Sequence, residues 1–245
     1  MFNLCRKLYA SLLLAAAVLG APAQAEPLRL TSGVGAPYFT PDRQGFLDLL
    51  VPEVFRRIGV EAEAVQYVAA SERSMLNANS GIDDGIAMRI RGLEKTYPNL
   101  IRIDEKVVDN DFVAYARQAS FDTTSFATLV GHEVAYIHGW KIFEANVPAG
   151  VSVTKAKDPA QLFSLLTNRR ADLVLFERWQ GNQILRERGI QATMLRPPLA
   201  STEMFMYLHK KHAHLVEPAA RALRAMKADG SYRRIASQAL PGYSD

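Results

Sequence analysis

Cysteine is almost absent from this chain. Of its 245 residues only Cys5 is a cysteine, and a lone thiol cannot form a disulfide within the chain. Cys5 also lies in an N-terminal segment that we expect to be removed. The mature protein therefore has neither a disulfide nor thiol chemistry, and its hydrophobic core alone must stabilise the fold.

A large excess of charge of either sign is missing as well. Lysine and arginine number 29 and aspartate and glutamate 25, which gives a formal net charge of +4. This excess is too small for the basic surface that nucleic-acid binding needs, so we expect no nucleic-acid partner. With 49% hydrophobic and 22% charged residues, the composition is that of an ordinary globular protein.

Hydrophobic runs long enough to span a membrane are not found. The apolar run at residues 12–19 is shorter than the roughly 20 residues that cross a bilayer. It follows Arg6 and Lys7 and precedes an A-Q-A sequence at residues 23–25, a pattern typical of a secretory signal peptide. We therefore predict that residues 1–25 are a cleaved signal peptide and that the mature protein is periplasmic. No cysteine follows the run, so no lipid anchor is expected.

The remaining sequence alternates between short apolar runs and amphipathic segments. The apolar runs predict strands at residues 28–31, 60–68, 85–88, 111–116, 134–137, 151–153 and 173–176. The amphipathic segments predict helices at residues 45–59, 71–79, 140–145, 159–167 and 179–188. A second block begins near Ser120. This alternation predicts an α/β fold with mostly parallel sheets, in which ligands bind beyond the carboxyl ends of the strands.

The C-terminal segment carries a helix–glycine–helix pattern. Apolar residues recur at helical spacing from Leu223 to Ile235, which predicts a helix on each side of a break. Gly230 is expected to end the first helix with a positive φ, and Ser231 to cap the second. The sequence of this segment, ALRAMKADGSYRRI, resembles the end of the extracytoplasmic solute-binding proteins of family 3.

Three further segments resemble the same family in the same order. They are GFLDLLVPEVFRRIGV at residues 45–60, LVGHEVAYIHG at 129–139 and LLTNRRADLVLFE at 165–177. The resemblance implies a type II periplasmic-binding fold with a ligand cleft between two lobes, which close by hinge motion.

The resemblance also sets the expected boundaries of the lobes. It implies a first lobe from residues 26–112 and 204–245, and a second from residues 113–203. Two strands would cross between the lobes, near residues 111–116 and 201–206.

Two aromatic residues lie in the first loop, where aromatics of the family often cover the ligand. Tyr38 and Phe39 are therefore candidate ligand-binding residues, since an aromatic ring stacks on a ligand or offers a cation its π face. The alternative is that one of them only packs the loop.

The family's carboxylate-binding arginine has no direct counterpart here. An ungapped match places Lys95 at that position, and a lysine lacks the bidentate fork of an arginine. Arg89 and Arg91 lie just upstream, on the expected strand-to-helix loop, and are the candidates for an anionic ligand group. The alternative is a surface ion pair with Glu94, Asp104 or Glu105.

Two candidates come from the second lobe. Glu177 falls at the family's ammonium-binding aspartate, at the carboxyl end of an apolar strand; the alternative is an ion pair with Arg178 or Arg89. Trp140 lies in the segment that usually supplies hydroxyls, and it would narrow the cleft or stack on a flat ligand. These departures argue against a plain α-amino acid and leave a small polar solute with an anionic group.

The sequence thus predicts a monomeric binding protein that passes a solute to an ABC-type importer or reports it to a membrane sensor. No catalytic residue and no cofactor are expected. No metal site is expected either, because the histidines of residues 209–214 have no nearby carboxylate or cysteine and lie among lysines. One alternative is an enzyme similar to cyclohexadienyl dehydratases, with Glu177 as the acid if burial raised its pKa. Another is a signalling subunit whose cleft has lost its ligand.

Overall fold

The computed structural model describes residues 26–67, 71–118 and 120–243. The predicted signal peptide lies outside the described residues. The strands are β1 (Leu28–Ser32), β2 (Ala62–Gln66), β3 (Gly85–Ile90), β4 (Leu100–Ala116), β5 (Glu133–Ile137), β6 (Ser152–Ala156), β7 (Leu173–Glu177), β8 (Thr193–Met194) and β9 (Ala200–His209). The α-helices are α1 (Phe46–Arg56), α2 (Ser71–Ser80), α3 (Lys141–Asn146), α4 (Pro159–Thr167), α5 (Arg178–Arg188), α6 (Ala213–Ala228) and α7 (Ser231–Ala239).

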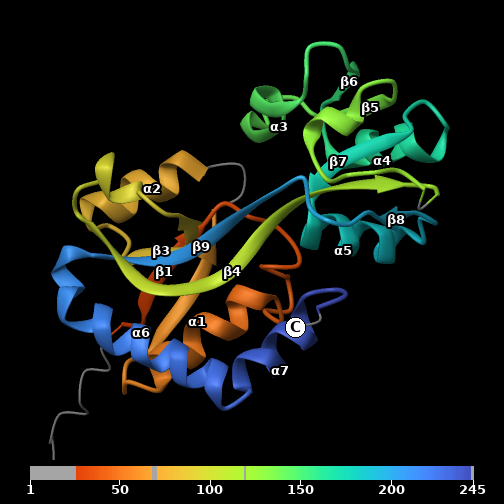
Figure 1. The fold of residues 1–245 in the computed structure, drawn as a ribbon. Coiled ribbons are helices and arrows are strands. Elements are labelled where there is room, and N and C mark those ends of the chain that lie inside the picture. Colours follow the sequence, from red (N-terminus) through yellow and green to blue (C-terminus); the bar gives the residue numbers. More distant parts are fainter. Residues whose placement is uncertain (1–25, 68–70, 119, 244–245) are drawn as a thin grey trace, which may run out of the picture.

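The strands are ordered β2-β1-β3-β9-β4-β7-β5-β6, and β8 pairs with β4. In the first half of this order, β1 is parallel to β2 and β3. In the second half, β5 is parallel to β6 and β7. The two long strands β4 and β9 run antiparallel between the halves (Figure 1). The predicted mixture of strands and flanking helices is confirmed.

Strand β4 is longer than predicted and belongs to both halves. It pairs with β9 from Leu100 to Phe112 and with β7 from Phe112 to Ala116. Only the apolar end of this strand was predictable from the sequence, because charged side chains interrupt the pattern before residue 111. At Phe112, β4 therefore changes its pairing partner from β9 to β7.

Helices cover both faces of the sheet in the first half. Alternate side chains of β9 separate into two clusters: Met204, Met206 and Leu208 pack with α1, α6 and α7, whereas Phe205 and Tyr207 pack with α2. Figure 1 shows α2 on one side of the β4–β9 pair and α7 on the other. The first half thus has a helix layer on each face, as the predicted α/β architecture requires.

The break between α6 and α7 is where the sequence predicts it. Gly230 has a φ of +79°, which a residue without a side chain adopts at little cost. Ser231 differs from its prediction: its hydroxyl bonds to Asp229 and to the carbonyl of Met226, and it does not cap α7. Arg57, at the end of α1, donates to both Asp229 and Ser231 and so joins the start of α7 to α1.

Among the described residues, no helix combines the length and the apolar character that a membrane-spanning segment needs.

Candidate functional site

A small cavity lies at the carboxyl ends of β1 and β3. It has a volume of about 90 Å³ and lies between the end of β1, the start of α2 and the last residues of β3. Its polar lining comes from Ser32, Ser74 and Arg89. Ser74 Oγ lies 2.7 Å from Thr31 Oγ1, which fixes the side of the cavity that α2 forms. The position agrees with the general rule that ligands bind beyond the carboxyl ends of parallel strands.

Arg89 is the charged group of this cavity. Its Nε is buried, and no atom of the described residues accepts a hydrogen bond from it. Buried polar groups in proteins are nearly always hydrogen-bonded, and a guanidinium has five N–H donors and no acceptor. The cavity therefore offers a cation that a carboxylate, or another small anionic group, can pair with.

Arg91, two residues further on, has a different environment. Its side chain is 55% exposed, lies 3.0 Å from Glu203 and covers the ring of Phe205. Strand β3 ends at Ile90, so Arg91 lies outside the strand. In the structure, Arg91 forms a surface ion pair, as the alternative interpretation held. Its partner is Glu203, which is not one of the three acids considered from the sequence. Lys95 is exposed.

The two aromatic residues of the first loop are buried. Tyr38 packs edge-on against Phe46, and Phe39 is 5% exposed; both belong to the core of the first half. The hydroxyl of Tyr38 donates a hydrogen bond of 3.2 Å to Glu177 Oε1. Both aromatic rings of this loop therefore pack in the hydrophobic core of the first half. The hydroxyl of Tyr38 also links the first half to the second.

Glu177 is the N-cap of α5. Its two oxygens accept hydrogen bonds from the amides of Trp179 (3.0 Å) and Gln180 (2.9 Å), and its exposed fraction is 1%. Burial raises the pKa of Glu177 to about 7, although these hydrogen bonds and that of Tyr38 act in the opposite direction. The partners weighed for it, Arg178 and Arg89, are not the groups that contact its carboxylate.

Trp140 packs inside the second half. Its indole ring stacks on Phe176 at 4.7 Å and on Phe143 at 5.7 Å between ring centroids, and meets Phe112 edge-on. The residue is partly buried and begins α3 as its N-cap. Most of the ring surface is thus engaged within the second half.

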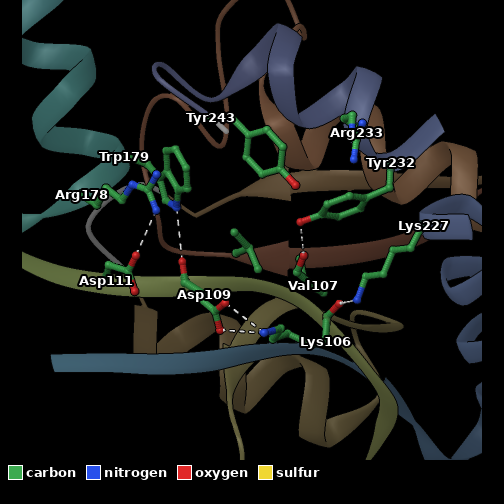
Figure 2. A pocket seen from close by; sticks show the side chains of 11 residues that line it. Lys106, Val107, Asp109, Asp111, Arg178, Trp179, Lys227, Tyr232, Arg233 and Tyr243 are labelled. Carbon is green, nitrogen blue, oxygen red and sulfur yellow. Dashed lines mark hydrogen bonds and ion pairs between the residues drawn. The ribbon is translucent and has the colours of Figure 1, made fainter. Parts of the chain in front are cut away.

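A larger cavity of about 410 Å³ lies on the opposite side of the β4–β9 pair. Figure 2 shows Arg178 and Trp179 at one end of it, Lys227 at the other, and Tyr232 and Tyr243 between them. Arg178 pairs with Asp111 at 3.1 Å, and Trp179 Nε1 donates to the carbonyl of Asp109. The walls therefore come from the crossing strand β4, the first turn of α5, the end of α6 and the C-terminal helix α7.

No family model matches the chain. An uncharacterized protein of Shewanella oneidensis is 28% identical over 175 residues, which cover 68% of this chain and 66% of that protein. The aligned part is thus slightly less than two thirds of the relative's length.

Solved structures match over most of the chain. A mutant of ArgBP from T. maritima has a TM-score of 0.62 at 21% identity, covering 87% of this chain and 94% of that one. The second substrate-binding domain assigned to an amino acid ABC transporter of Streptococcus pneumoniae has a TM-score of 0.69 at 17% identity, covering 88% and 100%. The periplasmic VFT2 domain of BvgS from Bordetella pertussis has 0.63 at 17%, covering 86% and 92%. This chain has the two-lobed periplasmic-binding-protein fold. The fold predicted from the family resemblance is confirmed.

In this periplasmic-binding-protein fold, the two halves described above are the lobes, and β4 and β9 cross between them. The exact lobe boundaries at residues 112 and 203 stay predictions. Of the six candidate site residues, Tyr38 and Glu177 bond to each other across the lobes. Arg89 lies apart from that pair, in its own cavity with Ser32 and Ser74.

Sequence reasoning missed the wall of the second cavity and the hydrogen bonds around Asp111. Asp111 binds both Arg178 and Ser201, 67 and 90 residues further along the chain. No local motif marks such a contact, because it forms only when β4, β9 and α5 meet. The position of Ser32 directly after the strand predicted at residues 28–31 was the available signal for the Arg89 cavity.

Proposed function

We propose that this protein is a periplasmic binding protein that captures a small solute through an anionic group. The observation that carries the proposal is Arg89, whose buried Nε lacks a hydrogen-bond acceptor among the described residues at a cavity next to two serines. A carboxylate of the solute would supply that acceptor, and charge-assisted hydrogen bonds of this kind are among the strongest in proteins. The fold supports the proposal, since its solved neighbours include substrate-binding domains.

The size of the cavity limits how much of the solute it holds. A volume of about 90 Å³ suits a head group, and the remainder of the solute would lie toward the second lobe. Closure of the lobes about β4 and β9 would then bury it, as in the hinge motion of other two-lobed binding proteins.

Glu177 bears on the chemical class of the solute. Its carboxylate is 1% exposed and already accepts hydrogen bonds from α5 and from Tyr38. It is therefore not available to bind an ammonium group unless those bonds break. For this reason we favour a small organic acid without an α-ammonium group over a plain α-amino acid.

A thermal-shift screen of the exported protein tests the proposal. The panel contains organic acids, amino acids, polyamines and aromatic acids, each tested on wild type, Arg89→Gln and Arg91→Gln. A ligand at about 100 times its dissociation constant adds about 2.7 kcal/mol to the folded state. We expect an organic acid to stabilise wild type and Arg91→Gln but not Arg89→Gln.

Arg91→Gln is the matched control, because it removes the same charge two residues away from a side chain that already has an ion pair. Stabilisation that persists in Arg89→Gln, or no stabilisation by any acid of the panel, would contradict the proposal.

The destination of the solute and the location of the protein are also part of the proposal. We propose that residues 1–25 direct export and that the protein serves an ABC-type importer or a membrane sensor. N-terminal sequencing of protein from the periplasmic fraction tests the first point: Glu26 is the expected first residue, and Met1 would contradict it.

One observation favours a second function. An acid with a pKa of about 7, as burial gives Glu177, suits general acid catalysis near neutral pH, which a dehydratase similar to cyclohexadienyl dehydratase would need. Turnover of prephenate or arogenate that disappears in Glu177→Gln would establish the enzyme. We favour binding, because both oxygens of Glu177 are occupied and the residue is buried.

A further inference from the structure

Arginine side chains gather at the end of the second lobe that lies away from the first. Strand β4 ends there with Ala116, which pairs with Leu173, the first residue of β7. Arg117 directly follows β4, and Arg169 and Arg170 lie in the loop before β7. Figure 1 shows β8 and the end of β4 at this side of the second lobe, remote from the first lobe. The ligand cleft is expected at the opposite, carboxyl end of β7.

Helix α5 brings a fourth arginine to the same end of the lobe. Arg188 is the last residue of α5. Shortly after it, Ile190 packs in the same core cluster as Ala171, which precedes β7, and Thr193 of β8 pairs with Ala116. The four side chains form what we call the arginine surface: Arg117, Arg169, Arg170 and Arg188.

Ion pairs do not balance the charge of the arginine surface. All four side chains are exposed, and none of them has an ion pair or a side-chain hydrogen bond to a described residue. The two acids at the start of the neighbouring strands have other partners: Asp172 accepts a hydrogen bond from the amide of Glu133, and Glu133 accepts one from the hydroxyl of Ser152. The four guanidinium groups are therefore available to another molecule.

The backbone of Arg169 has a conformation that favours glycine. Its φ is +58°, and the amides of Arg169 and Arg170 donate to carbonyls of the last turn of α4, an ending in which glycine is the usual residue. Helix α5 does end in this way, with Gly189 at a φ of +61°. A residue with a side chain costs stability there. Since Arg169 gains no ion pair in the described chain, this cost indicates a contact with another molecule.

We propose that the arginine surface docks a partner protein through a segment rich in aspartate and glutamate. A guanidinium pairs with a carboxylate through two parallel hydrogen bonds, and several arginines at one end engage successive acidic side chains. Because the surface lies away from the cleft, the partner stays bound while the lobes open and close. The proposal does not depend on a solute at Arg89.

The surroundings of the arginine surface favour an acidic protein over an anionic membrane. Proteins that lie on a membrane combine basic residues with apolar side chains that enter the lipid. Of the exposed large hydrophobic side chains in the described chain, three belong to the first lobe and Val130 to the second. A single valine gives the second lobe little apolar area to insert, so carboxylates of a protein are the better match.

Fluorescence anisotropy of the exported protein with a labelled hexaglutamate peptide tests the surface. A Gly-Ser peptide of the same length is the control, and vesicles of phosphatidylglycerol and of phosphatidylcholine are tested in parallel. We expect hexaglutamate to bind at about 0.02 M salt and more weakly at about 0.2 M, where screening is stronger. Binding of neither peptide, equal binding of both, or binding of the anionic vesicles alone would overturn the proposal.

Paired substitutions locate the bound peptide. Arg117→Gln with Arg170→Gln should weaken binding about tenfold, since each exposed ion pair contributes little by itself. Arg186→Gln with Arg234→Gln is the matched control, because both are exposed arginines without an ion pair in the described chain, and it should leave binding unchanged. Equal losses in the two double variants would show a general effect of charge and overturn the proposal.

Arg169→Gly tests the argument from the backbone. We expect it to weaken binding of hexaglutamate while the melting temperature stays the same or rises, because glycine suits a positive φ. Unchanged binding, or a lower melting temperature, would contradict the argument.

Arg89→Gln separates this proposal from the proposed function. We expect it to leave binding of hexaglutamate unchanged, whether or not the cavity at Arg89 takes an organic acid. Binding that is lost in Arg89→Gln and kept in the Arg117→Gln and Arg170→Gln double variant would place the peptide at the cavity and overturn the proposal.

Discussion

The carboxyl group of Glu177 has several structural roles that no sequence motif indicates. It caps α5, accepts a hydrogen bond from Tyr38 of the other lobe and is 1% exposed. Its pKa is about 7, above the usual value of 4.5, because burial disfavours the charged form. The folded protein therefore holds a proton there at a pH at which the unfolded chain has lost it.

This pKa predicts how stability depends on pH. Between about pH 4.5 and pH 7 the folded state binds more protons than the unfolded state, so this group makes the free energy of unfolding fall as pH rises. The full loss is on the order of 3 kcal/mol. Urea unfolding of wild type and Glu177→Gln at pH 5 and pH 8 measures it: the wild type should lose more stability than the variant. Parallel losses would show that Glu177 does not titrate in this window.

Helix α5 depends on a glycine for its packing. A Cβ at Gly181 would lie 2.3 Å from the hydroxyl oxygen of Tyr115, which is fully buried and donates to the carbonyl of Arg178. The helix therefore contacts β4 only because residue 181 has no side chain. This contact places the first turn of α5, with Glu177 and Arg178, beside the crossing strand.

Gly181→Ala should accordingly destabilise the protein, even though alanine is the better helix former. We expect a loss of about 1–3 kcal/mol from overpacking, measured by urea unfolding. Gly150→Ala is the control, because a Cβ there meets no atom within 4 Å, and it should change stability by less than about 0.5 kcal/mol. Equal effects of the two substitutions would refute the packing argument.

Elements with strong local signals were predictable from the sequence. Helix α4 spans the predicted residues 159–167, because Asp158 caps it and Pro159 starts it. The break at Gly230 was predictable because a glycine can end a helix with a positive φ. The length of β4 was not, since its first part is stabilised by pairing with β9, about 100 residues further along the chain, and charged side chains hide the pattern.

The candidate site was less predictable than the fold. Sequence proximity treated Arg89 and Arg91 alike. In the structure β3 ends at Ile90, so that Arg89 lies in the strand with a buried Nε and Arg91 lies beyond it with an exposed side chain. The position of Glu177 was found, but not the direction of its side chain, which the start of α5 and Tyr38 together determine. The larger cavity had no sequence signal, because its walls come from three distant segments.

Contacts between the lobes hold the molecule as a whole in its present arrangement, among them the hydrogen bond from Asn182 of α5 to the carbonyl of Pro241. Apart from β4, β9 and the packing of Trp179, the described contacts include the hydrogen bond from Tyr38 to Glu177, which are 139 residues apart in sequence. Tyr38→Phe removes this bond and keeps the ring. We expect it to lower the free energy of unfolding by about 1 kcal/mol.

Small-angle scattering provides the second measurement on Tyr38→Phe. Without the hydrogen bond between the lobes, the radius of gyration should increase relative to wild type. A variant with unchanged scattering and unchanged stability would mean that the bond does not restrain the lobes.

The order of the chain through the two lobes has a consequence for how the protein matures. Elements β5 to α5 of the second lobe are continuous in sequence, whereas one core cluster of the first lobe contains both Leu30 of β1 and Ala236 of α7. A polypeptide chain that emerges with its N-terminus first contains the whole second lobe before its last two helices have emerged. Domains generally fold as units during synthesis, so the second lobe can fold at that stage. The first lobe must wait for the final helix, so the last step of maturation is the docking of α7 onto α1, a helix made near the beginning.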